Sequence, residues 1–368
     1  MASFSRWQEK AVKYDFSVVF LSLIITIFGL FNVYSATIVT EGSAFFNRQL
    51  VSAIIGVVFM IVFSFVDYRK LGRSVYIIYG INILLLLVVL AMGRSALGAR
   101  RWISFGFINL QPSELMKISL MLVLAKYFSN DSNVEGYTLR ELMIPAGMAA
   151  IPAALVIIQP DLGSALMLLV AAFSVFLFVK IRTQSLIILG IVAMIALPLV
   201  YNFALKDYQK QRVVTFLDPA SDPKGSGYNS IQSKIAVGSG RFSGKGYMKG
   251  TQSQLNFLPE HHTDFIFSVF SEEHGFIGSF ILLILYSLLF ISGFRIAARA
   301  DDKFGVLLAI GLTAVIFWQT LINMGMVIGI MPVVGITLPF MSYGGTSMVI
   351  NMIIIGFLQS IAIRRYMF

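Results

Sequence analysis

The sequence contains no cysteine and few charged residues. Of its 368 residues only 12% are Asp, Glu, Lys or Arg, whereas 57% are hydrophobic. Without cysteine there are no disulfides, thiolate nucleophiles, zinc–thiolate sites or iron–sulfur clusters. Soluble domains usually have about a quarter charged residues, and disordered chains are polar and poor in aromatics. The composition therefore excludes both an ordinary soluble protein and a disordered one.

Acidic residues are scarcer than basic ones. Lys and Arg number 28 and Asp and Glu 18, which gives a net charge of +10. In so apolar a chain this excess indicates membrane orientation and not nucleic-acid binding.

Long apolar runs predict an all-α polytopic membrane protein in a single integral-membrane domain, 1–368. The fourth run is short and contains Glu114 and Lys117, and only Gln159-Pro160 separates the fifth from the sixth, so nine spans remain an alternative to ten. The candidate spans are 16–36, 46–66, 74–92, 112–127, 141–158, 161–179, 184–203, 265–294, 304–328 and 341–363.

Lys and Arg in the short connections predict the orientation. They are frequent near the N-terminus, around 69–73, at 180–182, at 295–303 and at 364–365, and sparse in the alternate connections. Positive loops stay inside, so we expect both termini in the cytoplasm. The basic head and first apolar run also fit a signal peptide, but the run is long and lacks a small-residue cleavage site, which favours an uncleaved span.

The connection between the seventh and eighth spans, 204–264, is an exception in length. It contains basic residues on the outer side and apolar and aromatic residues throughout. Connections of this length are usually functional or disordered. Because of its apolar content we expect an extracytoplasmic loop with short helices packed over the outer face.

Ionisable residues at membrane depth are costly and are functional candidates. Glu114 and Lys117 lie three residues apart on one helix face, as a structural ion pair or as part of a polar cavity. Asp161 is placed to cap the sixth span or to face such a cavity. Arg101 and Arg212 lie on the outer side, where a guanidinium can bind phosphate or snorkel at the interface.

Residues 258–267 gather Glu260, His261, His262 and Asp264 where the long loop enters the eighth span. Their spacing matches no zinc motif. A loosely held Mg²⁺ or Mn²⁺ between a carboxylate such as Asp264 and ligand phosphates is a further possibility, and no organic cofactor is expected. The carboxylate can act as a general base or only as a helix cap. Basic groups around it suggest an anionic, membrane-borne ligand.

Several motifs follow one another along the chain: 98–103 (GARRWI), 111–117 (QPSELMK), 159–163 (QPDLG), 212–219 (RVVTFLDP), 250–267 (GTQSQLNFLPEHHTDFIF) and 323–347 (NMGMVIGIMPVVGITLPFMSYGGTS). In this order they resemble the motifs of the SEDS proteins and, within them, of the RodA branch, a relative of FtsW. The resemblance covers the chain from the first span to the last. It implies ten spans with a large outer loop between the seventh and eighth, in the bacterial cytoplasmic (inner) membrane.

The resemblance also implies a function. Members of the family polymerise lipid II into β-1,4-linked glycan strands at the outer face of the membrane during cell elongation, with a class B penicillin-binding protein, a transpeptidase, as partner. The resemblance gives the role of the essential aspartate to Asp264, as general base of an inverting glycosyltransferase. Glu114 and Lys117 match residues of the central cavity, and Arg101, Arg212 and Asp161 are expected substrate contacts.

Two other functions remain as alternatives. A lipid II flippase would need polar groups through both leaflets, whereas the unusual polar groups here cluster in the outer half. A non-enzymatic scaffold of the wall-synthesis complex would not need Asp264.

Overall fold

The chain was analysed as a computed structural model. The structure describes residues 14–92, 94–96, 99–105, 108–131, 136–199, 202, 207–222, 225–255 and 257–365. The basic head at Arg6, Lys10 and Lys13 lies outside these residues.

Each of the ten apolar runs falls on a helix. Six of the helices, α2, α3, α7, α13, α14 and α15, are long and apolar enough to cross a membrane; the other four are shorter or less apolar, so ten spans and cytoplasmic termini stay predictions. The helices are α2 (Phe16–Thr37), α3 (Ala44–Phe65), α5 (Val75–Met92), α6 (Pro112–Ser129), α7 (Leu139–Ile158), α8 (Leu162–Phe178), α9 (Thr183–Leu199), α13 (Ile266–Ala298), α14 (Lys303–Ile328) and α15 (Gly345–Arg364).

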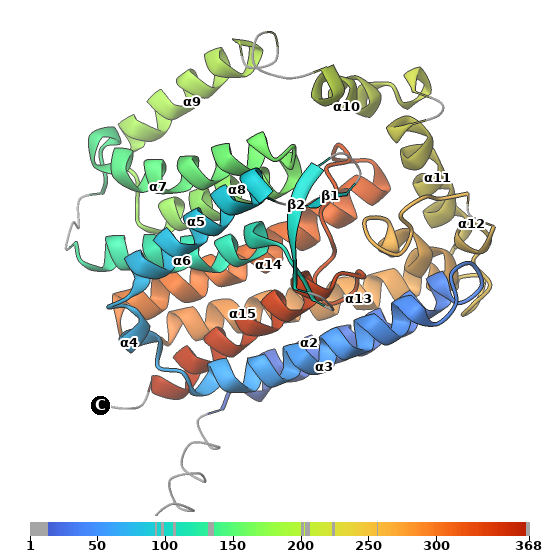
Figure 1. Ribbon diagram of the computed structural model, residues 1–368, viewed down its shortest axis with the longest axis horizontal. Helices are drawn as coiled ribbons and strands as arrows, with labels where there is room; N and C mark the ends of the chain where they lie inside the picture. Colours follow the sequence, from blue (N-terminus) through green and yellow to red (C-terminus); the bar gives the residue numbers. More distant parts are fainter. Residues whose placement is uncertain are drawn as a thin grey trace, which may run out of the picture.

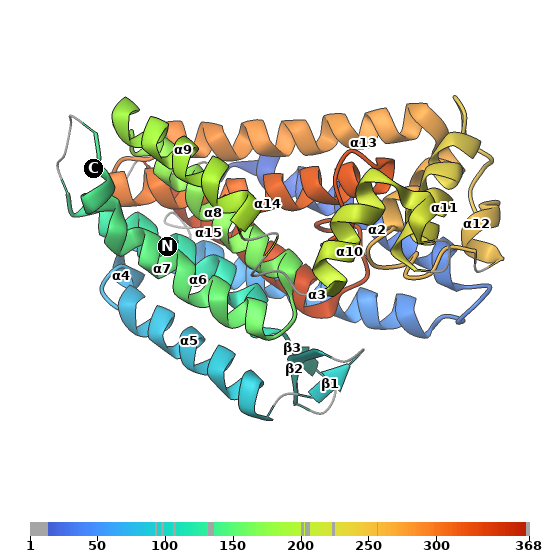
Figure 2. The same cartoon turned by 90° about the horizontal axis from the view of Figure 1, so that it is seen from above.

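The centre of the bundle is formed by α6, α14 and α15 (Figures 1 and 2). Met116, Leu120 and Leu124 of α6 are fully buried, and so are most residues of α15. A helix that is apolar on all sides suits such a central position. On one side α2 and α3 pack against α13 and α15, and on the other α7 and α8 pack against α6 and α14.

The bundle has two distinct ends. The short helix α4 (Tyr68–Leu71) lies at the left in Figure 1, and the short helices of the long connection lie at the right. These are α10 (Asp207–Leu217), the 3₁₀ turn η2 (Pro219–Ser221), α11 (Ser226–Ser239) and α12 (Thr251–Gln254). Of them, α11 packs against α13 and α14. Above the bundle, α9 stands apart from its central helices and exposes apolar side chains such as Ile187 and Met194.

The prediction of an all-helical chain was wrong between residues 94 and 110. Three antiparallel strands form a small sheet in the order β1-β2-β3: β1 (Arg94–Ala96), β2 (Ala99–Phe105) and β3 (Ile108–Leu110). Trp102 and Ile103 of β2 are residues that favour strands, and the sequence has Gly98 and Gly106 between the strands. The sheet carries Arg101 on its middle strand, β2.

Candidate active site

Asp264 lies in the turn just before α13 and is half-buried. Its backbone is fixed by Asn323 of α14, whose Nδ2 donates to the carbonyl oxygen of Asp264 at 2.9 Å and to that of Ile336 at 2.6 Å. Gly335 faces its side chain: a Cβ there would lie 3.3 Å from Asp264 Oδ2, and Gly335 has a φ of +75°. The described residues place no hydrogen-bond donor on the Asp264 carboxylate, so it is available to a ligand.

The surroundings of Asp264 make it a stronger base than an ordinary aspartate. The pKa of Asp264 is raised to about 6, chiefly by burial and also by the carboxylates of Glu260 and Asp161, while the guanidinium groups of Arg212 and Arg101 lower it. Desolvation and like charges both disfavour the ionised form of an acid. Arg101, Asp161 and Arg212, from β2, the start of α8 and α10, therefore act on one carboxylate.

Asp161 has two roles in the structure. It is the N-cap of α8, because its Oδ1 accepts from the backbone N–H of Ser164 at 3.2 Å. The same oxygen lies 3.8 Å from Nη1 of Arg101, and Oδ2 accepts from Nε2 of Gln111 at 3.2 Å. Arg101 also donates to the carbonyl oxygen of Pro160. The cap thus holds β2, and with it Arg101, against the beginning of α8.

Glu114 and Lys117 form a buried ion pair, which is one of the two alternatives that their spacing left open. Lys117 Nζ lies 2.7 Å from Glu114 Oε2, and the side chains are 4% and 9% exposed. The structure pairs these groups with each other at the first turns of α6. A role in binding substrate stays a prediction.

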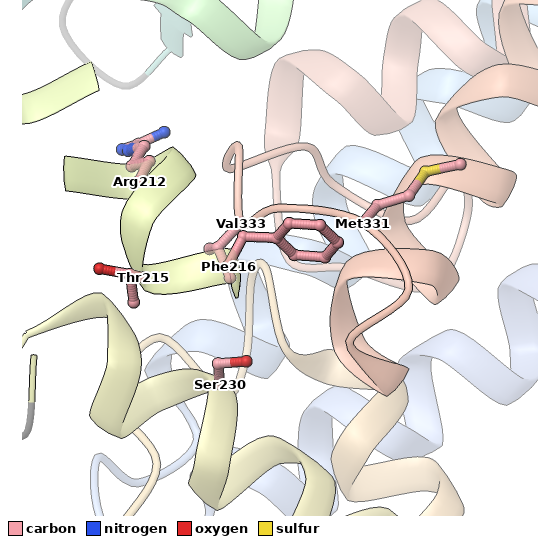
Figure 3. Close-up of a pocket in the computed structure, with 6 residues that line it drawn as sticks. All are labelled: Arg212, Thr215, Phe216, Ser230, Met331 and Val333. Atoms are coloured by element: carbon pink, nitrogen blue, oxygen red, sulfur yellow. The ribbon is translucent and has the colours of Figure 1, made fainter. Parts of the chain in front are cut away.

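Arg212 lines a small pocket with other residues of the long connection. Thr215 and Phe216 of α10, Ser230 of α11, and Met331 and Val333 form the remaining walls (Figure 3). The ring of Phe216 points toward Met331, and Arg212 lies one turn back along α10. The pocket measures about 10 Å³, which is the space of one water at most. In this conformation it positions Arg212 and is too small for a sugar.

Two further acids, Glu272 and Glu273 of α13, hold the long connection in place. Glu272 is completely buried and accepts from the N–H and the hydroxyl of Thr251, both at 2.9 Å, and from the N–H of Gln252 at 3.2 Å. Lys245 neutralises it. Glu273 accepts from Ser35 of α2. We call Glu272 with Thr251, Gln252 and Lys245 the clamp; it ties residue 251 to residue 272, and Asp264 lies between them.

A break in α13 supports the clamp. Gly275 has φ +64° and ψ −159°, which separates the turns around Glu272 from the rest of the helix. Backbone groups released by the break bond to residues 241–246 instead: Phe276 N–H donates to Arg241 O at 2.9 Å, and Lys245 N–H to Glu272 O at 3.0 Å. A Cβ on residue 275 would come within 2.3 Å of Gly244 N, so the crossing requires glycine.

The neighbouring histidines make protein contacts. His261 is buried, and its Nδ1 lies 2.9 Å from Leu258 O and its Nε2 3.0 Å from Ala36 O. The ring of His262 packs edge-on against that of Phe45, with 4.8 Å between the ring centroids. Burial lowers the pKa of His262. Among the described residues no group of three or more His, Asp or Glu could hold a metal ion. A protein-built metal centre does not fit these residues; an ion held mainly by substrate phosphates stays a prediction.

Sequence reasoning missed two residues of the site, Asn323 and Gly335. Both lie in the signature stretch 323–347, but no role was predicted for either. A buried Asn in a membrane helix is itself a signal, because its amide must find partners there. Gly335 gave no signal of its own, since its importance depends on the distance to Asp264.

Comparison with known sequences gives consistent results. The family model for FtsW, RodA and SpoVE, described as "Cell cycle protein", matches residues 15–367. The peptidoglycan glycosyltransferase MrdB of Escherichia coli (strain K12) is 42% identical over 340 residues, which are 91% of each chain. MrdB of Helicobacter pylori (strain ATCC 700392 / 26695) is 39% identical over 341 residues, 91% of this chain and 88% of that protein.

Solved structures agree with these relatives. The rod shape determining protein RodA of Thermus thermophilus superposes with a TM-score of 0.72 at 29% identity, covering 96% of this chain and 98% of that one. A chain from a peptidoglycan synthase complex, described as coordinating polymerization and crosslinking, gives a TM-score of 0.83 at 31% identity, with the same coverage.

Proposed function

This chain belongs to the FtsW, RodA and SpoVE family of cell cycle proteins, and from that premise we propose that Asp264 is the general base with which it polymerises lipid II. The chain is a peptidoglycan glycosyltransferase and a multi-pass protein of the bacterial cytoplasmic membrane. The observation that carries the proposal is the Asp264 carboxylate, which is half-buried, free of donors among the described residues, and within the field of two arginines.

The reaction joins two lipid-linked glycans. Asp264 accepts the proton of the acceptor's 4-hydroxyl as that oxygen forms a bond to the donor's anomeric carbon. The bond from this carbon to the pyrophosphate breaks, and the lipid pyrophosphate leaves with the electron pair. Direct displacement inverts the anomeric centre and gives a β-1,4 bond. With a pKa of about 6, Asp264 is mostly ionised at neutral pH and is a better base than an ordinary aspartate.

The cationic groups receive the leaving group. Arg212 and Arg101 provide fixed positive charge beside Asp264, and guanidinium groups match phosphate oxygens in geometry. Asp161 holds Arg101 in position. Glu114 and Lys117 form a polar wall of the substrate cavity, and their mutual neutralisation lets them remain at membrane depth. A bound Mg²⁺ or Mn²⁺ would act on the substrate's phosphates.

The topology follows the same proposal. Ten spans with both termini in the cytoplasm place the helices of 204–264 and Asp264 at the outer face, where lipid II presents its sugars. A class B penicillin-binding protein is the proposed partner. It is supported by the similarity to a chain of a synthase complex that couples polymerization to crosslinking.

Purified protein and lipid II in detergent test the assignment. Asp264→Ala should lower the polymerisation rate about 10²- to 10⁴-fold, the usual contribution of a general base. Asp218→Ala, which removes an exposed acid of the same loop, should leave the rate unchanged. A near wild-type rate for Asp264→Ala would refute the role of Asp264. Absence of polymer with the wild-type chain, alone and with its partner, would favour a flippase or a scaffold.

A further inference from the structure

The end of the bundle that the proposed topology places in the cytoplasm contains a groove that the polymerase reaction does not use. It lies between the first turns of α2 and the last turns of α13, two helices that pack side by side (Figures 1 and 2). Ser17, Phe20 and Leu21 line it from α2, and Leu288, Ile291 and Arg295 from α13. Its volume is about 280 Å³. Asp264, at the other end of α13, is far from it.

The spacing of the lining residues defines an apolar groove with one charged end. Residues 17, 20 and 21 share a face of α2, and residues 288, 291 and 295 share a face of α13. Phe20, Leu288 and Ile291 are 64%, 44% and 52% exposed. The groove is thus open toward the bilayer, and its walls match hydrocarbon and not water.

Arg295 has no acidic partner among the described residues. Four acids at this end of the bundle pair with other arginines instead. Asp15 lies 3.9 Å from Arg365, Asp67 lies 3.4 Å from Arg364, and Asp301 and Asp302 each lie 3.3 Å from Arg69. The Arg295 guanidinium is therefore available to an anion from outside the chain.

We propose that this groove binds an anionic phospholipid, with one acyl chain between α2 and α13 and the headgroup phosphate on Arg295. A guanidinium binds phosphate through two parallel hydrogen bonds, and basic pockets between membrane helices on the cytoplasmic side recognise anionic headgroups. The Ser17 hydroxyl, at the same end of the groove, provides a further polar contact. The lipid stabilises the packing of α2 on α13, and α13 is the helix that begins just after Asp264.

Native mass spectrometry of the full-length chain tests this site. The protein in detergent is titrated with phosphatidylglycerol or with phosphatidylcholine of the same acyl chains, and the bound lipid is counted after the detergent is removed in the spectrometer. Wild type should retain phosphatidylglycerol at a concentration about tenfold lower than phosphatidylcholine. Arg295→Gln should lose most of this difference. Arg299→Gln should keep it, because Arg299 is an exposed arginine at the C-cap of α13 and does not line the groove.

A second variant addresses the acyl chain. Ser17→Phe fills the groove at an exposed position without changing charge, so it should weaken retention of both lipids. Equal retention of the two lipids by wild type, or unchanged phosphatidylglycerol retention in Arg295→Gln, would overturn the proposal. If Arg295→Gln instead releases a co-purifying membrane protein while lipid retention stays the same, the groove is a protein interface and the proposal also fails. Lipid retention is measured without polymerase activity, so it is independent of the role of Asp264.

Discussion

Asp264→Asn should make the protein more stable while abolishing its activity. Burial raises the pKa of Asp264 from an ordinary 3.8 to about 6. Ionising this carboxyl in the folded protein therefore costs about 3 kcal/mol more than in the unfolded chain, at roughly 1.4 kcal/mol for each pH unit. Asparagine has nearly the same shape and never ionises, so the variant avoids this cost.

The sign of the effect fixes its pH dependence. A raised carboxyl pKa means that the native state holds the proton more tightly, so wild type loses stability as pH rises through the window from 3.8 to about 6. The gain of Asp264→Asn over wild type should be about half a kcal/mol at pH 4 and about 3 kcal/mol above pH 7.

Thermal unfolding in detergent, followed by tryptophan fluorescence across this pH range, measures the gain. Asp218→Asn is the matched control, because this acid is exposed in the same loop, and it should change the unfolding midpoint little at any pH. Two results would refute the reasoning. If Asp264→Asn gains nothing at pH 7, the carboxyl is not held at a cost. If it gains equally at pH 4 and pH 7, the gain comes from packing and not from ionisation.

Three further predictions concern the same region of the molecule. First, kcat/KM should fall below pH 6, about tenfold by pH 5, as the proposed base becomes protonated. Glu260→Gln should move this acidic limb of the pH profile to lower pH and Arg212→Gln should move it to higher pH, because the two variants remove opposite charges beside Asp264. An acidic limb that neither variant moves would belong to another group. Second, Lys117→Met should destabilise the fold by about 3–5 kcal/mol by leaving Glu114 buried without its partner, and adding Glu114→Gln should restore most of this in thermal unfolding; no recovery would mean that the pair is not the cause. Third, Glu272→Gln should lower kcat with little change in KM, since the clamp positions the base and does not bind substrate; an unchanged kcat in steady-state polymerisation would contradict the clamp.

Hydropathy alone located the main helices. The predicted spans 16–36 and 304–328 correspond to Phe16–Thr37 and Lys303–Ile328, each within a residue or two. The signal is strong because a membrane helix must satisfy its backbone internally and expose apolar side chains over its whole length. The match therefore depended on each segment by itself, with no knowledge of its neighbours.

Features that depend on distant residues were not predictable in this way. The predicted span 265–294 gave no hint of the break at Gly275, because the broken bonds are replaced by residues 241–246. The strands at 94–110 were also missed, since a short strand is defined by pairing across turns and not by its own composition.

The roles of the candidate site residues stay predictions, but the structure shows an arrangement of them that the sequence did not indicate. The motif resemblance singled out Asp264, Arg101 and Asp161, and the structure brings Arg101 within 3.8 Å of Asp161 and both into the field of Asp264. Asn323 fixes the turn at Asp264 through a hydrogen bond that spans 59 residues of sequence. No local pattern reports a bond of that range.

The way in which the turn at Asp264 is held suits the general-base role proposed for its carboxylate. Donors on the carboxylate itself would stabilise the ionised form, lower its pKa and weaken it as a base. The structure instead fixes the backbone: Asn323 holds the Asp264 carbonyl on one side, and the clamp at Glu272 closes the loop on the other. These contacts hold the turn through its backbone and leave the carboxylate without a donor from the described residues. For the proposed general base, moving a hydrogen bond from the Asp264 carbonyl to its carboxylate would keep the fold and weaken the base.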